Sequence, residues 1–277
     1  MTGAIDYKPL VQKMVWSYSR LEAFEDCPYK WFLKYILDFK EDDKFYASYG
    51  SFIHHLLEQY YSGKKKDRNE LVMEFITGFQ SQVVGYRPTE KTLSDYIQNG
   101  VNYLQAFEPL PFNAVAIEDK VRFSIEREGE PDIQMVGFID FLGEKDGDLY
   151  IVDHKSRKLK PRSNRAKPTL KDKELDHMLR QLYVYAVAVE QKYGKLPTGL
   201  CFNCFRTNTL IVEPFRKEVY EETKRWVRDT VKRIENTAEF PPNQNVFSCF
   251  WICGVNRHCK YDIQSLEERR ANRERES

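Results

Sequence analysis

Two segments that are typical of neighbouring β-strands each carry an acidic residue near the end. The first, residues 135–142, is MVGFIDFL and contains Asp140; the second, residues 149–155, is LYIVDHK and contains Asp153 and Lys155. Only the polar turn GEKDGD separates them, so we expect the two strands to be adjacent in one sheet. Because side chains alternate between the two faces of a strand, Asp153 and Lys155 should project from the same face.

This strand pair constrains the chemistry as well as the fold. If the strands pair, Asp140 comes to the same edge of the sheet as Asp153, with Lys155 beside them. Two carboxylates can hold a divalent cation, and an adjacent ammonium suits metal-assisted cleavage of a phosphodiester. An aspartate at a strand end is also a common turn or cap residue, so these strands alone leave a purely structural role open.

Length and composition limit the classes of protein to which this chain can belong. At 277 residues, 42% of them hydrophobic and 31% charged, the chain can form one large domain or two modest ones. No apolar run approaches the roughly 18 residues of a membrane span, and no secretory signal precedes the first expected helix. We therefore expect a cytoplasmic protein with no membrane partner. The net charge is +1, so affinity for nucleic acid must come from a local basic patch.

Such a patch follows the second strand directly. Between Lys155 and Lys173 lie nine Lys or Arg residues, counting both ends, and one acid, Asp172. Pro161 and Pro168 predict a loop here. The residues expected to contact a DNA backbone are Arg157, Lys158, Lys160, Arg162, Arg165 and Lys167. A solvated loop without a partner is the alternative interpretation.

Cysteines gather near the C-terminal end. Three of the six fall in the segment CFWICGVNRHC, residues 249–259. Disulfides are rare in cytosolic proteins, so clustered cysteines indicate a metal site or buried thiols, and Gly254 and Arg257 suit an irregular loop around a metal. Cys201 and Cys204 lie on a predicted strand at positions that point to opposite faces, and we interpret them as buried thiols.

Hydrophobic periodicity predicts helices, then strands, then helices and strands again. Helices are expected at residues 17–36 with a break at Cys27-Pro28, and at 50–61, 70–83, 90–107, 175–193 and 216–237; three strands are expected within 114–153 and two more at 200–205 and 209–212. The charged tail after residue 262 is expected to fray or to be disordered. This order indicates an α/β core with a mainly helical N-terminal region.

Five ordered motifs resemble the RecB-like branch of the PD-(D/E)XK nuclease superfamily. They are SYSRLEAFEDCPYKWFLKYI (17–36), GSFIHHLLE (50–58), GFIDFL, IVDHK and RQLYVYAVAV (180–189). They are similar to that branch's S-x-S-x-L-x-x-F-x-x-C-P signature, its G-x-x-x-H-x-x-L-E helix, its second and third motifs and its Q-x-x-x-Y helix. The resemblance covers roughly residues 15–260. Iron–sulfur members of this branch include AddB-type recombination nucleases and the CRISPR-associated adaptation exonucleases.

The resemblance implies a restriction-endonuclease-like core, a central mixed sheet flanked by helices, with a helical N-terminal region and a C-terminal cysteine-cluster segment. One integrated domain is expected, in four parts: a helical region with the first cluster cysteine and the histidine motif (1–110), the nuclease core (111–240), a cysteine segment that packs back on the N-terminal region (241–262), and a charged tail (263–277).

The resemblance also assigns roles to single residues. Asp140 and Asp153, the latter where many members have Glu, would ligate Mg²⁺ or Mn²⁺, and His54 would add a nitrogen ligand. A histidine ligand favours Mn²⁺. Lys155 would orient or deprotonate the attacking water, or stabilise the developing charge on the phosphorane. The residues that would support this catalytic set or contact the strand are Gln181 and Tyr185.

The cysteines match the four-cysteine pattern of the iron–sulfur members, with one cysteine before the core and three after it. They are Cys27, Cys249, Cys253 and Cys259. Four thiolates suit a [4Fe–4S] cluster, which would be structural here. Three residues separate the second and third cysteines where the family usually has two, so Zn²⁺ in a four-cysteine site is the competing interpretation.

The expected function is a metal-dependent DNA exonuclease that prefers single-stranded ends and acts in recombination or repair, phage DNA processing or CRISPR adaptation. Its partners would be DNA and a separate helicase, recombination or adaptation protein. The alternative is a non-catalytic DNA-binding or scaffolding subunit of a larger nuclease–helicase complex. The complete set of Asp140, Asp153, Lys155 and His54 favours the enzyme.

Overall fold

Five strands form one sheet in which the spatial order follows the order in the sequence. In the computed structural model, which describes residues 7–245 and 247–261, the strands are β1 (Asn113–Arg127), β2 (Glu130–Lys145), β3 (Asp148–Lys155), β4 (Gly199–Cys204) and β5 (Thr209–Pro214). Neighbours are antiparallel except β3 and β4, which are parallel. The predicted central mixed sheet flanked by helices is confirmed.

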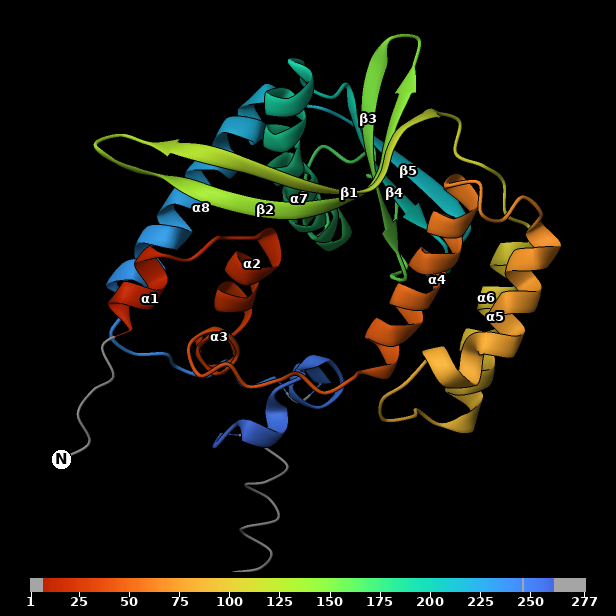
Figure 1. Ribbon diagram of the computed structural model, residues 1–277, viewed down its shortest axis with the longest axis horizontal. Helices are drawn as coiled ribbons and strands as arrows, with labels where there is room; N and C mark the ends of the chain where they lie inside the picture. The colour runs from red at the N-terminus through yellow and green to blue at the C-terminus, as the bar shows by residue number, and fades with distance from the viewer. Residues whose placement is uncertain (1–6, 246, 262–277) are drawn as a thin grey trace, which may run out of the picture.

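Helices cover the sheet from several sides (Figure 1). They are α1 (Lys8–Gln12), α2 (Tyr18–Asp26), α3 (Pro28–Tyr35), α4 (Phe45–Tyr61), α5 (Arg68–Gln82), α6 (Glu90–Gln105), α7 (Leu170–Tyr193) and α8 (Lys217–Asn236), with short helical turns at Ser248–Ile252 and Asn256–His258. Helices α1, α2, α7 and α8 share one apolar core with the sheet. Helices α4, α5 and α6 build a second core around Phe205, which directly follows β4. None of the helices in the described ranges is long and apolar enough to cross a bilayer.

Capping residues explain where several helices begin. Ser17 caps α2, and Cys27 adopts an extended conformation and caps α3 through its sulfur, which produces the predicted break before Pro28. Helix α7 begins at Leu170, five residues earlier than predicted, because Thr169 and Asp172 form a reciprocal capping box. The last part of the basic segment is therefore helical and not a loop.

The two strands that carry the predicted acids separate at the acids themselves. Strands β2 and β3 pair from Lys145 and Asp148 as far as Phe141 and Val152, and the pairing ends there. Asp140 and Asp153 are the next residues on the two strands, so both carboxylates lie in the fork between them. The predicted meeting of the two acids at one edge of the paired region is confirmed.

The cysteine-bearing segment lies against the loop that leads into α4. The Asp42 backbone N–H donates to the Gly254 carbonyl at 2.7 Å, and the Lys44 ammonium donates to the Phe250 carbonyl at 3.4 Å and to Asn256 Oδ1 at 3.1 Å. Segments more than 200 positions apart in the sequence are thus in contact. The predicted charged tail, 263–277, lies outside the described residues.

Candidate active site

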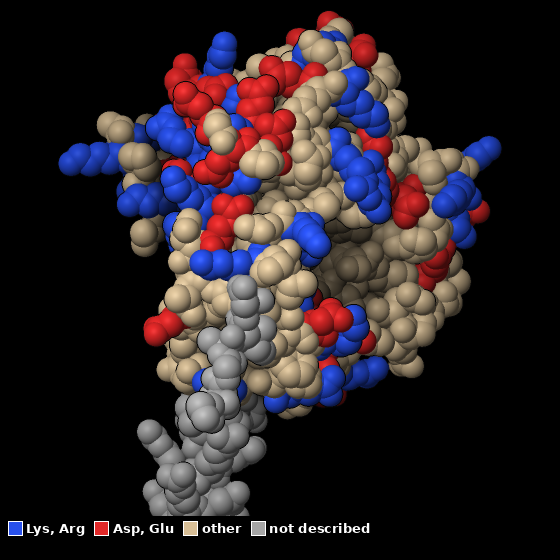
Figure 2. Space-filling view, turned by 60° about the vertical axis from the view of Figure 1, so that its left-hand side comes forward, with Lys and Arg blue, Asp and Glu red and all other residues tan. Residues whose placement is uncertain are grey.

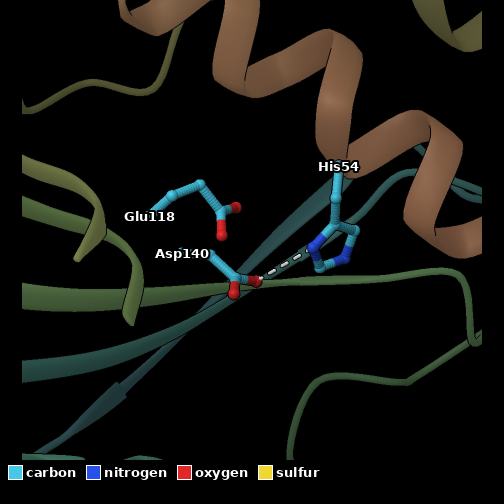
Figure 3. Close-up of side chains that lie close together, drawn as sticks. All are labelled: His54, Glu118 and Asp140. Atoms are coloured by element: carbon cyan, nitrogen blue, oxygen red, sulfur yellow. Dashed lines mark ion pairs between the residues drawn. The ribbon is translucent and has the colours of Figure 1, made fainter. Parts of the chain in front are cut away.

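A histidine from α4 and two carboxylates from the β1–β2 hairpin point toward one another beside the fork (Figure 3). The Asp140 Oδ2 atom accepts the His154 backbone N–H at 2.8 Å and lies 3.4 Å from His54 Nδ1. In the part of the chain that the structure describes, His54, Glu118 and Asp140 are the one set of three or more His, Cys, Asp or Glu whose ligand atoms all lie within 4.8 Å of one another. Two oxygens and an imidazole nitrogen converging in this way suit a divalent cation.

The tautomer of His54 is fixed by its second contact. The Nε2 atom lies 2.7 Å from the His154 carbonyl oxygen, which can only accept, so Nε2 carries the proton. Burial lowers the pKa of His54, which favours the neutral ring. The unprotonated Nδ1 then faces the carboxylate of Asp140, a contact between two lone pairs that a cation between them would make favourable. This is the orientation in which a backbone carbonyl prepares a histidine to bind a metal.

Glu118 was not predicted from the sequence. It lies on β1 opposite Asp140 in the register of the hairpin and has a positive φ of 46°, which is uncommon for a residue other than glycine. Burial, with Glu58 and Asp153 nearby, raises the pKa of Glu118 to about 7. Counting back from the turn at Glu128-Gly129 would pair position 118 with position 139, and only the register shift between Ile125 and Arg127 brings position 118 opposite position 140, so the sequence carried no simple signal for it.

Asp153 and Lys155 lie on one face of β3, as the alternation predicted. Lys155 Nζ is 2.8 Å from Asp153 Oδ2 and donates to Gln181 Oε1 at 3.0 Å. Burial lowers the pKa of Lys155, but the charge and hydrogen bond of Asp153, together with the charge of Asp140, outweigh burial and leave the pKa raised, so the ammonium is charged. Asp153 is thus turned toward the lysine and lies outside the compact set of three candidate ligands. Its role as a metal ligand stays a prediction.

The carboxylate of Asp140 is held in an environment that disfavours its charge. Burial and the negative charge of Asp153 raise the pKa of Asp140 well above its ordinary value, although the His154 N–H acts in the opposite direction. Like charges gathered in a poorly solvated place repel one another unless a cation neutralises them. The donor set therefore fits a divalent metal ion.

Helix α7 supplies the two polar residues that the Q-x-x-x-Y motif predicted near the site. Gln181 donates to the Tyr185 hydroxyl at 3.1 Å while its oxygen holds Lys155. The Tyr185 ring packs on Gly137, where an added Cβ would lie 2.6 Å from a ring carbon. Glycine is therefore required at position 137, because any side chain would push α7 away from the fork.

His154 faces the other side of the sheet and is fully enclosed. Asn203 Nδ2 donates to His154 Nδ1 at 3.0 Å and lies 2.9 Å from the Tyr103 hydroxyl of α6. Burial lowers the pKa of His154 well below its ordinary value, so the ring is neutral. The backbone of His154 contacts both His54 and Asp140, so this buried chain of hydrogen bonds holds the peptide that orients two of the three candidate ligands. Neither Asn203 nor Tyr103 was singled out from the sequence.

We expect Asn203→Ala to lower the free energy of unfolding by about 1–3 kcal/mol, since it leaves the buried groups of His154 and Tyr103 without their partner. A melting curve measures this change. Asn102→Ala, at an exposed position of α6, is the matched control and should unfold as the wild type does. Equal stability of the two variants would show that the buried network does not hold His154.

The basic segment contains two kinds of cation. The Arg162 guanidinium is ion-paired with Glu213 at 2.7 Å and with Asp176 at 2.6 Å. Lys158, Lys160, Arg165 and Lys167 are not among the ion pairs of the described residues, and the ion pair of Arg157 with Glu174 is long, at 3.8 Å. Arg162 thus anchors the segment to α7 and β5, and the other five stay predicted contacts to DNA.

The four predicted cluster cysteines line one cavity. Cys27, Cys249, Cys253 and Cys259 all border it, together with Lys30 and Asn243, whose backbone N–H groups each donate to Cys27 Sγ at 3.4 Å. Burial raises the pKa of Cys253, and that of Cys259 to about 11. The remaining two cysteines are buried free thiols, as interpreted: Cys201 and Cys204.

Comparison with known proteins agrees with this architecture. The model of the PD-(D/E)XK nuclease superfamily matches residues 15–263. The chain is also similar to the crystal structure of a candidate exonuclease from Eubacterium rectale, with a TM-score of 0.51, 14% sequence identity and 92% of each chain covered. At that identity the likeness shows the fold alone. No curated protein matches the sequence. The restriction-endonuclease-like core expected from the motifs is thus confirmed, and the chain belongs to the PD-(D/E)XK nuclease superfamily.

Proposed function

We propose that this nuclease is a metal-dependent DNA exonuclease that degrades single-stranded ends. The observation that carries the proposal is the convergence of His54, Glu118 and Asp140, with ligand atoms within 4.8 Å of one another, next to a charged lysine. The fixed tautomer of His54 and the crowding of carboxylates both favour a bound dication. A histidine ligand favours Mn²⁺ over Mg²⁺.

Each residue then has a separate task. A bound divalent ion would polarise the phosphoryl oxygen and lower the pKa of a water molecule. Asp140, Glu118 and the Nδ1 atom of His54 would hold the ion, and Asp153 would keep Lys155 at the fork. Lys155, charged and bonded to Gln181, would orient the attacking water and stabilise negative charge that develops on the phosphorane.

The basic segment that follows β3 is suited to a polyanion. Figure 2 shows one face of the molecule, on which Lys and Arg side chains lie among Asp and Glu side chains around a hollow right of centre. The exposed cations of the basic segment follow β3 directly, so they lie next to Lys155, the last residue of β3, along the chain. Contacts of this kind position a phosphate backbone without reading its sequence.

We further propose that the four cysteines hold a structural [4Fe–4S] cluster. They line one cavity, which fits a shared group, and backbone N–H groups already point at Cys27. A four-cysteine zinc site would bring the sulfurs to about 3.8 Å from one another, since Zn–S bonds are about 2.3 Å long. Within the described residues no three cysteine sulfurs lie within 4.8 Å of one another, which favours a larger group.

End-labelled single-stranded and double-stranded DNA, incubated with Mn²⁺, Mg²⁺ or EDTA, tests the proposed activity. We expect loss of label from linear single strands with Mn²⁺, slower loss with Mg²⁺ and none with EDTA. A circular single strand of the same sequence is the control, since it has no end and should persist. Cleavage of the circle would contradict an exonuclease, and binding without any metal-dependent cleavage would favour a scaffolding subunit.

A further inference from the structure

An aromatic ring lies exposed on the β1–β2 hairpin, two residues before Asp140. The side chain of Phe138 is 51% exposed, whereas Gly137 packs under Tyr185 and Ile139 is buried in the core shared with α7. Strand alternation therefore turns Phe138 away from α7 and toward solvent. Two residues of strand rise correspond to about 7 Å, so the ring lies within one nucleotide's reach of the carboxylate.

Two cations flank this ring. Lys120 is the cross-strand partner of Phe138, and its Nζ lies 5.7 Å from the ring centroid. Arg122 is the partner of Val136, one pair further along the same face. Both side chains are exposed, and within the described residues neither takes part in an ion pair. The face thus combines one flat apolar ring with two cations that are outside any ion pair of the described residues.

We propose that Phe138, Lys120 and Arg122 form a platform for single-stranded DNA, and this rests on the proposed nuclease function. A base next to the scissile phosphate stacks on Phe138, and the two cations contact the flanking phosphates. Stacking of unpaired bases on aromatic side chains between basic residues is how proteins bind single strands without reading sequence. Charge complementarity and the direct connection to Asp140 and Glu118 favour this occupant over an apolar peptide.

The platform provides a physical reason for the proposed preference for single-stranded over double-stranded DNA. Inside a duplex, both faces of a base are covered by its neighbours, so stacking on Phe138 requires an unpaired or unstacked nucleotide. A duplex could still contact Lys120 and Arg122 through its phosphates. Loss of the ring is therefore expected to weaken binding of single strands and to leave the weaker binding of a blunt duplex unchanged.

The test measures binding of a labelled single-stranded oligothymidylate, with Ca²⁺ in place of the catalytic metal, by fluorescence anisotropy. Phe138→Ala is expected to raise Kd by about 5- to 150-fold, the range for the loss of one stacked base. Phe138→Trp should keep wild-type affinity. Val212→Ala, which removes a side chain that is 48% exposed on β5, is the matched control and should change nothing.

Salt dependence provides an independent measurement. Lys120→Ala and Arg122→Ala should each reduce the slope of log Kd against log salt by about 0.7, the value for one phosphate contact on a single strand. Phe138→Ala should leave that slope unchanged. The platform would be overturned if Phe138→Ala left the Kd for the single strand unchanged, or if it weakened the binding of the single strand and of the duplex equally. Wild-type protein that binds through Phe138 but cleaves nothing would contradict the nuclease proposal and leave the platform standing.

Discussion

Asp140→Asn is expected to reduce metal-dependent DNA hydrolysis by about 10³-fold while raising the melting temperature of the metal-free protein. The loss of rate follows because an amide is a poor ligand for a dication, whose stabilisation of the transition state amounts to several kcal/mol. The gain in stability follows because Asp140 is buried beside Asp153, which raises its pKa. Each kcal/mol of relief is worth about 2–4 °C. Calorimetry and an end-label assay measure the two effects.

The same substitution has a pH signature. A carboxyl group whose pKa is raised by folding has no effect on stability below its unfolded pKa, because it is then neutral in both states. As the pH rises from there through the raised value, the group ionises more readily in the unfolded state, and the folded protein loses stability. The wild-type metal-free protein should therefore lose stability over that range, and Asp140→Asn should lose less. Asp119→Asn is the control, because Asp119 lies on the same hairpin but pairs with Lys192. A destabilised and still active Asp140→Asn protein would contradict the metal site.

Cys27→Ala should remove the visible absorption of the anaerobically purified protein, its bound iron and several kcal/mol of stability. The large effect is expected because the free energy of binding a structural metal is also free energy of folding, about 10–16 kcal/mol for zinc in small domains. Absorption spectra, iron and sulfide analysis and melting curves measure these changes.

Cys204→Ala is the matched control for that experiment, since it also removes a thiol, but one that is buried on β4 and does not line the cavity. It should keep colour and iron. A colourless wild-type protein that contains one zinc ion would refute the iron–sulfur assignment. It would indicate that the structural metal is zinc. A Cys27→Ala protein with full iron content would exclude Cys27 as a ligand.

The sequence was sufficient where local patterns determine structure. Alternation on β3 placed Asp153 and Lys155 on one face, and they lie 2.8 Å apart. Helical spacing and Pro28 predicted the break between α2 and α3. The start of α7 was missed because a capping box within the polar basic segment gives no hydrophobic periodicity.

The place of Glu118 in the site could not be predicted from the neighbouring sequence for a different reason. It stands next to Asp119, and nothing in their immediate sequence shows that one acid faces the site and the other pairs with Lys192. The distinction depends on the register of the hairpin and on a backbone conformation with positive φ. Asn203 is similar, because its partner His154 lies on the neighbouring parallel strand and is brought close only by the crossover through α7.

The contact between the cysteine segment and the loop before α4 also has a kinetic consequence. Gly254, which accepts the Asp42 N–H, follows Asp42 by 212 positions. A ribosome that adds about 5–20 residues per second needs about 10–40 s to cover that distance. Throughout this interval Asp42 and Lys44 lack the partners that residues 250–256 supply. Docking of the cysteine segment is therefore a late event in biogenesis, because all five strands of the sheet are synthesised before it.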